Sequence, residues 1–308
     1  MRKNINSEKI IGRVYQHNLA IKKVQNQQSE NFGKDFISGT LDVATDEDGL
    51  NVLTIHYTYV TPTTKAGKTN NTYKTLEKII NGTPTWLSDG KDAATKIKVD
   101  TALALNDFYV QDQLVSVKKN EGGFITIINE LPEEAERNTF SADMVITNVL
   151  RVEADEERGI IEHVKLKGAI FNFRNDILPI EFVVKNNDGM NYFESLEITP
   201  SSPVYTKVWG KITSTTVKTS EQVESAWGEP AVSTSERNIK EWVVTGTAKE
   251  PYEFGEENVL TVEELTKAMQ NREILLADIK KKNEEYQASK NSGGISSSAA
   301  INTGTFNF

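Results

Sequence analysis

The sequence contains no cysteine, few histidines and no long apolar run. The missing cysteine excludes a disulfide scaffold, a thiol nucleophile, an iron–sulfur cluster and any Cys-ligated zinc. Three histidines, His17, His56 and His163, argue against a multi-histidine metal site. No segment approaches the roughly 18 consecutive apolar residues of a transmembrane helix, and the N-terminus lacks the apolar region of a signal peptide. We expect a cytoplasmic protein with no cofactor, no metal and no membrane contact.

Motifs that carry catalysis are also missing. Residues 66–69 (AGKT) resemble the end of a phosphate-binding loop, but the first glycine of that motif would fall on Pro62. Residues 46–49 (DEDG) resemble part of a calcium-binding loop, but its bidentate glutamate would fall on Ile55. There is no Gly-x-Ser-x-Gly nucleophile motif. These absences favour a protein that is not an enzyme.

The net charge of −9 is unevenly distributed along the 308 residues. Residues 1–120 carry a net charge of +3, whereas residues 121–160 carry −7 and residues 221–260 carry −6. The acidic groups are therefore concentrated in two blocks. A basic groove elsewhere on the surface remains compatible with this composition.

Short runs of alternating apolar and polar residues dominate the chain and predict β-strands. Asp-Gly and Gly-Gly pairs predict hairpin turns at residues 46–49 and 120–123. A short helix is expected over Tyr73–Ile80, and a second at the end of Leu103–Phe108. Residues 37–43 and 166–172 resemble each other, each with a glycine where a barrel strand would bend. The pattern predicts a mostly β protein built from two similar units.

A helix near the C-terminus has a clear start signal. Thr261 and Glu264 form a capping box, in which each side chain satisfies a backbone N–H group of the first turn. We expect a helix within residues 259–287 and a flexible tail over residues 288–308, which carries no charge after Lys290. An acidic, proline-containing stretch marks the boundary between a first β domain (1–143) and a second (144–258).

One face of the strand Val204–Val217 combines aromatic and basic residues. Tyr205, Lys207, Trp209 and Lys211 alternate with apolar residues and therefore share one face. Flat rings stack on unpaired bases while lysines follow the phosphates, which is the chemistry of single-strand binding. The other interpretation is a face whose aromatic rings pack under a neighbouring loop, with lysine stems lying over them.

Other segments carry the same combination of residues. The loop at residues 61–78 is basic, and alternating strands in both halves of the chain place cations and aromatic rings on one face. A solvated loop and core phenylalanines are the plain alternatives for these segments. The complete set of candidate nucleic-acid-binding residues is Arg13, Tyr15, Tyr57, Tyr59, Lys65, Lys68, Tyr73, Lys74, Lys165, Lys167, Phe171, Tyr205, Lys207, Trp209 and Lys211.

The glycine-bent strands, the helix between strand groups, the basic loops and the polar tail resemble phage-type single-stranded DNA-binding proteins with tandem OB folds. The resemblance implies two OB-like β-barrels, each a five-stranded Greek-key barrel with ligand across one sheet face. It also implies sequence-independent single-stranded DNA binding in replication or recombination, in the cytoplasm of an infected host. The aromatic residues Phe306 and Phe308 at the tip of the tail are candidates for self-association or for binding a replication partner.

Two other functions would use the same residues. A β-rich structural protein of a phage particle would use exposed aromatic rings for subunit contacts. A carbohydrate-binding module would use the rings without needing the lysines. Salt separates these alternatives, because phosphate binding weakens steeply with ionic strength.

Overall fold

The computed structural model describes residues 4–155, 159–223, 227, 231–256 and 259–292. The expected contacts of Phe306 and Phe308 lie outside these residues. The described strands form one sheet. Two separate sets of five strands within this sheet each close into a barrel. The first five, barrel 1, are β1 (Asn6–His17), β3 (Asp35–Ala44), β4 (Val52–Val60), β5 (Lys96–Val110) and β6 (Gln113–Ile127). The second five, barrel 2, are β7 (Asn138–Val152), β8 (His163–Phe171), β9 (Ile177–Val184), β10 (Val204–Val223) and β11 (Ala231–Thr247).

The two barrels have the same topology. In barrel 1, β1 pairs with β3 and β5, and the parallel pair β4–β6 closes the barrel. In barrel 2, β7 pairs with β8 and β10, and the parallel pair β9–β11 closes it. A helix follows the third strand of each barrel: α1 (Asn71–Ile80) in barrel 1 and α3 (Asn187–Ser195) in barrel 2. This is the five-stranded Greek-key barrel of the OB fold, which confirms the expected fold class.

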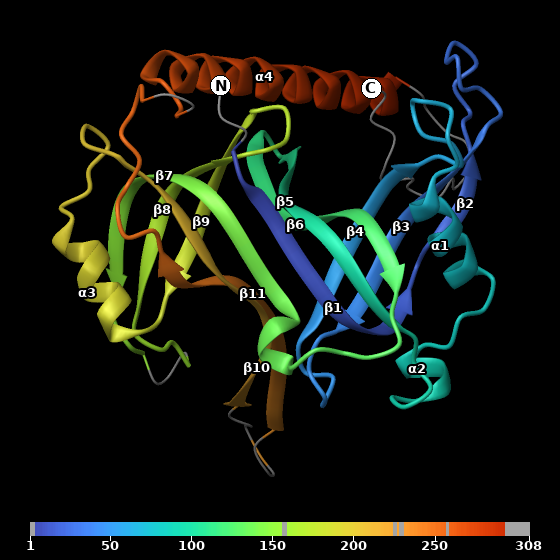
Figure 1. The fold of residues 1–308 in the computed structure, drawn as a ribbon, viewed down its shortest axis with the longest axis horizontal. Helices are drawn as coiled ribbons and strands as arrows, with labels where there is room; N and C mark the ends of the chain where they lie inside the picture. The colour runs from blue at the N-terminus through green and yellow to red at the C-terminus, as the bar shows by residue number, and fades with distance from the viewer. Residues whose placement is uncertain (1–3, 156–158, 224–226, 228–230, 257–258, 293–308) are drawn as a thin grey trace.

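Smaller elements lie around the barrels. They are β2 (Ala20–Lys23), which pairs along β3, α2 (Trp86–Asp89) and the short 3-10 helix η1 (Glu134–Glu136). The predicted helix over Tyr73–Ile80 is confirmed as α1. In Figure 1, α1 and α3 flank the molecule on opposite sides, with the barrels between them.

The barrels are joined through their first strands. Residues 6–10 of β1 pair antiparallel with residues 138–142 of β7, so one sheet runs through both barrels. The buried apolar core is likewise continuous from barrel 1 to barrel 2. Strand β7 begins at Asn138, so residue 143, the predicted end of the first domain, lies within this strand.

Each barrel sends a long hairpin onto the other barrel. In the β5–β6 hairpin, Lys118 Nζ donates to the backbone oxygen of Glu181 in β9, 2.7 Å away. In the opposite direction, Asn51 before β4 holds β10, because its amide donates to the Ile212 oxygen (3.3 Å) and accepts from Ser214 N (2.7 Å). These contacts fix the two barrels against each other.

Two local predictions in β5 and β6 were wrong. Residues 120–123 lie within strand β6, and the helix expected at the end of Leu103–Phe108 is part of strand β5. The glycines serve close packing there, since a Cβ atom on Gly122 would lie 2.5 Å from the Tyr57 ring. A Gly-Gly pair therefore marked a tight contact between strands instead of a turn.

The C-terminal helix, α4 (Val262–Ser292), lies along one side of both barrels (Figure 1). Its start is confirmed: Thr261 Oγ1 accepts from Glu264 N (3.1 Å), and a Glu264 carboxylate oxygen accepts from Thr261 N (3.0 Å). The helix runs five residues beyond the predicted limit at residue 287, so the first part of the expected tail is helical.

Candidate nucleic-acid interface

Four of the predicted contact residues are buried and cannot stack on a base. Tyr57 and Tyr73 belong to the core of barrel 1. Phe171 and Tyr205 are 0% and 1% exposed in barrel 2. The prediction that these four aromatic rings are accessible was therefore wrong.

A second apolar layer explains the burial of Phe171 and Tyr205. Their rings do point to the outer face of barrel 2, but residues of the segments 252–256 and 259–268 cover that face. The Tyr205 ring lies 4.9 Å from the Tyr252 ring and 5.7 Å from the Phe254 ring. The strand pattern identified the outer face correctly, but it held no information on a segment that arrives from the C-terminal part of the chain.

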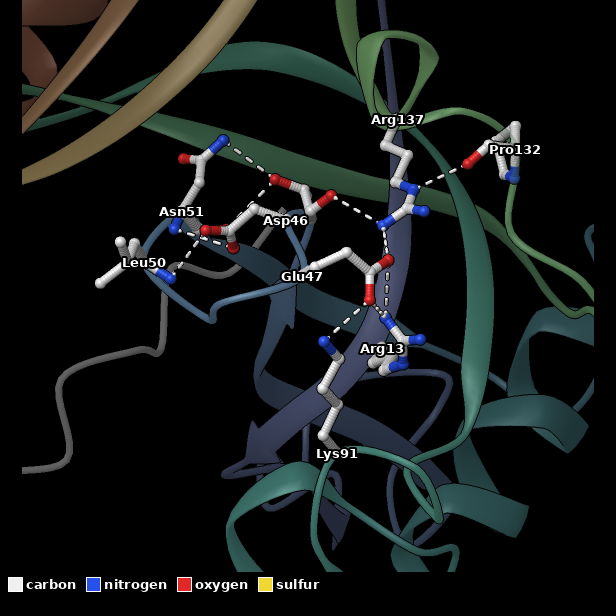
Figure 2. A network of polar contacts seen from close by, with 9 residues as sticks. Arg13, Asp46, Glu47, Leu50, Asn51, Lys91, Pro132 and Arg137 are labelled. Atoms are coloured by element: carbon white, nitrogen blue, oxygen red, sulfur yellow. Dashed lines mark hydrogen bonds and ion pairs between the residues drawn. The ribbon is translucent and has the colours of Figure 1, made fainter.

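Arg13 is engaged in a network of charged groups (Figure 2). The Glu47 carboxylate accepts from Arg137 at 2.6 Å and Arg13 at 3.1 Å, and it forms an ion pair with Lys91 at 3.0 Å. Hydrogen bonds from Arg137 first, then Lys91 and Arg13, lower the pKa of Glu47 to about 2. Arg13 therefore neutralises Glu47 in the folded protein.

This network also ties the segment between the barrels to barrel 1. Arg137 lies just before β7, and its Nε donates to the Pro132 oxygen at 2.8 Å. Tyr15 lies nearby, half-buried, with its ring centre 6.1 Å from that of Trp86. The surroundings of Arg13 and Tyr15 indicate structural roles.

Trp209 is the one predicted aromatic residue of barrel 2 that is accessible, since Phe171 and Tyr205 are buried. Its ring lies over Gly246 of β11, where a Cβ atom would come within 2.5 Å of the indole nitrogen. The ring is 41% exposed, and the half-buried Lys207 and Lys211 flank it on the same face of β10. Partial burial lowers the pKa of Lys211, and the charge of Glu136 opposes that shift. The result is a flat ring between two cations.

A further cation joins this face from barrel 1. Lys9 of β1 pairs with Thr139 of β7, which in turn pairs with Lys211 of β10, so all three side chains lie on one row across the sheet. Strand spacing places Lys9 about 10 Å from Lys211. No ion pair among the described residues engages Lys9, Lys207 or Lys211. We call Lys9, Lys207, Trp209 and Lys211 the Trp209 face.

Lys9 is not among the residues expected from the sequence, because the row depends on pairing between strands that are remote in the chain. A strand pattern shows which residues of one strand share a face, but not which strand lies beside it. The pairing of β1 with β7 carries that information.

A second accessible set lies at one end of barrel 1. Tyr59 is exposed at the end of β4, with its ring centre 4.8 Å from that of Phe36 in β3. In the following loop, Lys65 and Lys68 are exposed on a tight turn closed by a 2.8 Å bond from Thr64 N to the Lys68 oxygen. Lys74 is exposed on α1. Phe36 was missed because it lay in a strand without a clear basic pattern.

Lys165 and Lys167 lie on the outer face of β8. Both contact the Glu181 carboxylate of β9, at 3.1 Å and 3.9 Å. They form a separate group from the Trp209 face. The structure therefore distributes the accessible candidates over three places instead of gathering them into one site.

Within the part of the chain that the structure describes, neither a metal site nor a membrane-spanning helix is seen. No cluster of three or more His, Asp or Glu side chains within the described ranges could hold a metal ion. Among those same residues, no helix is long and apolar enough to cross a membrane.

Together, the fold and these surfaces define a tandem OB-barrel protein with basic and aromatic groups on its outer faces. The chain belongs to the YorF family, whose model matches residues 6–282. No curated protein matches the sequence.

The solved structures that resemble the fold include two of the single-stranded DNA binding protein from Thermus aquaticus. A deletion mutant shares 12% identity with a TM-score of 0.46, covering 83% of this chain and 100% of that chain. The wild-type protein shares 12% identity with a TM-score of 0.45, covering 83% of this chain and 98% of that chain.

Proposed function

We propose that this protein binds single-stranded DNA without sequence preference and without catalysis. The observation that carries the proposal is the Trp209 face, where a half-exposed indole lies between two lysines on an OB barrel. Stacking of a base on such a ring contributes roughly 1–3 kcal/mol, and lysines beside it neutralise the neighbouring phosphates. OB barrels are a common scaffold for this chemistry. We extend the proposal to DNA replication or recombination of a phage, on the tandem-barrel resemblance.

A titration of a fluorescent oligo-dT at several salt concentrations tests the proposal. We expect saturable binding whose log K falls linearly with log salt, by roughly 0.7 for each phosphate contact to a single strand. Duplex DNA of the same length and a neutral oligosaccharide serve as controls and should bind more weakly. Absence of oligo-dT binding at low salt, or equal binding of the oligosaccharide, would contradict the proposal.

A structural role in a phage particle is the second candidate, and one observation favours it. The tip of the β5–β6 hairpin exposes Val110, Leu114 and Val117, which are suited to a subunit contact. Assembly through apolar groups should persist at high salt. Sedimentation of the protein alone across the same salt series therefore separates the two functions.

A further inference from the structure

A groove of about 430 Å³ lies between the barrels, and none of its lining residues belongs to the Trp209 face. The β5–β6 hairpin of barrel 1 forms one wall, and strands β7, β8 and β9 of barrel 2 form the other. Its volume is near the lower end of the roughly 300–1,000 Å³ typical of small-ligand sites. The side chains that matter for its chemistry are Leu105, Ser116, Lys118, Lys167, Ile180 and Glu181.

Positive charge exceeds negative charge in this groove. Lys165 and Lys167 share the Glu181 carboxylate, at 3.1 Å and 3.9 Å. Lys118 reaches the same residue from the opposite wall, but it donates to the backbone oxygen of Glu181 and not to the carboxylate. One carboxylate therefore faces three ammonium groups at this point.

Lys118 is also largely removed from water. Its ammonium lies 5.1 Å from the centre of the Trp242 ring. Burial lowers the pKa of Lys118, and the charges of Glu181 and Glu241 oppose that shift while Lys165 adds to it. Lys185 already pairs with Glu241 at 2.6 Å. A bound anion would supply the negative charge that these lysines lack.

The hairpin wall is held in place by α4. Asp107 in β5 accepts from Ser116 in the groove wall and from Arg272 of α4, the latter at 3.0 Å. Both partners of the Arg272–Asp107 pair are almost fully buried. Leu105 and Ile180 add apolar surface beside the lysines. The groove thus combines a rigid wall, an excess of cations and an apolar surface of the kind that a nucleobase contacts.

We propose that this groove binds the phosphodiester backbone of single-stranded nucleic acid, so that one strand contacts the hairpin of barrel 1 and the outer face of barrel 2 together. The inference rests on the proposed function and adds a second contact region to the Trp209 face. In this proposal Lys118, Lys165 and Lys167 contact phosphates. The negative charge of Glu181 repels the phosphates and limits the affinity.

The test compares two double variants of the full chain in the oligo-dT titration. Lys165→Ala/Lys167→Ala removes Lys167, which lines the groove, and Lys165, which shares the Glu181 carboxylate with it. Lys249→Ala/Lys267→Ala removes two exposed cations elsewhere. Loss of two phosphate contacts should reduce the slope of log K against log salt by about 1.4. The control variant should keep the wild-type slope. Glu181→Gln, which removes the opposing charge, should strengthen binding.

The outcomes separate the groove from the proposed function. Equal slopes for the two double variants, or unchanged binding by Glu181→Gln, would overturn the groove. If Trp209→Ala still weakens binding in that case, the proposed function stands without it. If the wild-type chain does not bind oligo-dT, both the groove proposal and the proposed function are wrong. Tripolyphosphate that binds the wild type but not Lys165→Ala/Lys167→Ala, with DNA binding equal in both, would show a site for small phosphates and overturn the assignment to nucleic acid.

Discussion

At the scale of single residues, exposure separates the aromatic rings that can bind from those that support the fold. Tyr205 and Trp209 are four residues apart on one face of β10, yet one is 1% exposed and the other 41%. The rings of Tyr252 and Phe254 pack against the Tyr205 ring, whereas the Trp209 ring lies over Gly246, which has no side chain to displace it. Alternation along a strand cannot distinguish these two positions.

Trp209→Ala should weaken single-strand binding by roughly 1–3 kcal/mol, because one stacking surface is lost. Trp209→Phe should retain part of the affinity, since a smaller ring can still stack. The measurements are the oligo-dT Kd and the melting temperature of each variant. A large drop in melting temperature with unchanged Kd would show that Trp209 is part of the core and that the Trp209 face is misassigned.

The lowered pKa of Glu47 leads us to expect a contribution to folding stability that is lost in acid. Its folded pKa of about 2 lies below the ordinary value of 4.5, so ionised Glu47 favours the folded state above pH 4.5. That contribution should be lost as the pH falls from 4.5 towards 2. Glu47→Gln should melt at a lower temperature than wild type at pH 7, and the two should converge in acid. A constant difference in melting temperature across this range would contradict the assignment.

At the scale of elements, sequence motifs correctly predicted features that depend only on residues close together in the chain. The capping box of Thr261 and Glu264 gave the start of α4, because its bonds lie within one turn. The glycine shared by the two similar segments marks corresponding strands: Cβ atoms on Gly39 and Gly168 would each lie 2.0 Å from a backbone oxygen of a neighbouring segment. The extent of β6, the cover over Tyr205 and the row from Lys9 to Lys211 depend on remote segments, so the sequence alone did not reveal them.

The loop between β4 and α1, together with the first turn of α1 that carries Lys74, gives an element-scale prediction. Replacing Lys65, Lys68 and Lys74 together by Ala should reduce the slope of log K against log salt by about 2, since each phosphate contact contributes roughly 0.7. All three side chains are exposed, so the melting temperature should hardly change. An unchanged slope would mean that this basic loop is solvated and does not bind DNA.

The attachment of helix α4 to the β5–β6 hairpin gives a second element-scale prediction. Arg272→Ala leaves the buried carboxylate of Asp107 without its cation, which typically costs about 3–5 kcal/mol of folding free energy. Lys267→Ala, at an exposed position on the same helix, is the matched control. Denaturant unfolding measures both variants. Equal stability of the two would show that α4 does not depend on this ion pair.

At the scale of the whole molecule, a buried carboxyl group joins the barrels. Glu8 lies on β1 where it pairs with β7, and it is 2% exposed. It accepts from Thr101 Oγ1 of barrel 1 at 2.9 Å and from Trp242 Nε1 of barrel 2 at 2.7 Å. Burial raises the pKa of Glu8 to about 7, and the two hydrogen bonds only partly offset that shift. The junction of the barrels therefore contains a group that titrates near neutrality.

The sign of its effect on stability is opposite to that of Glu47. Between pH 4.5 and about 7 the folded chain keeps the Glu8 proton while the unfolded chain releases it, so stability should fall as the pH rises. At about 1.4 kcal/mol per pH unit, the loss is at most on the order of 3 kcal/mol. Glu8→Gln should remove this slope and still fold, because the Thr101 hydroxyl can turn to accept from the new amide. Melting temperatures of wild type and variant between pH 4.5 and 8 measure it, and parallel profiles would show that Glu8 does not titrate in this range.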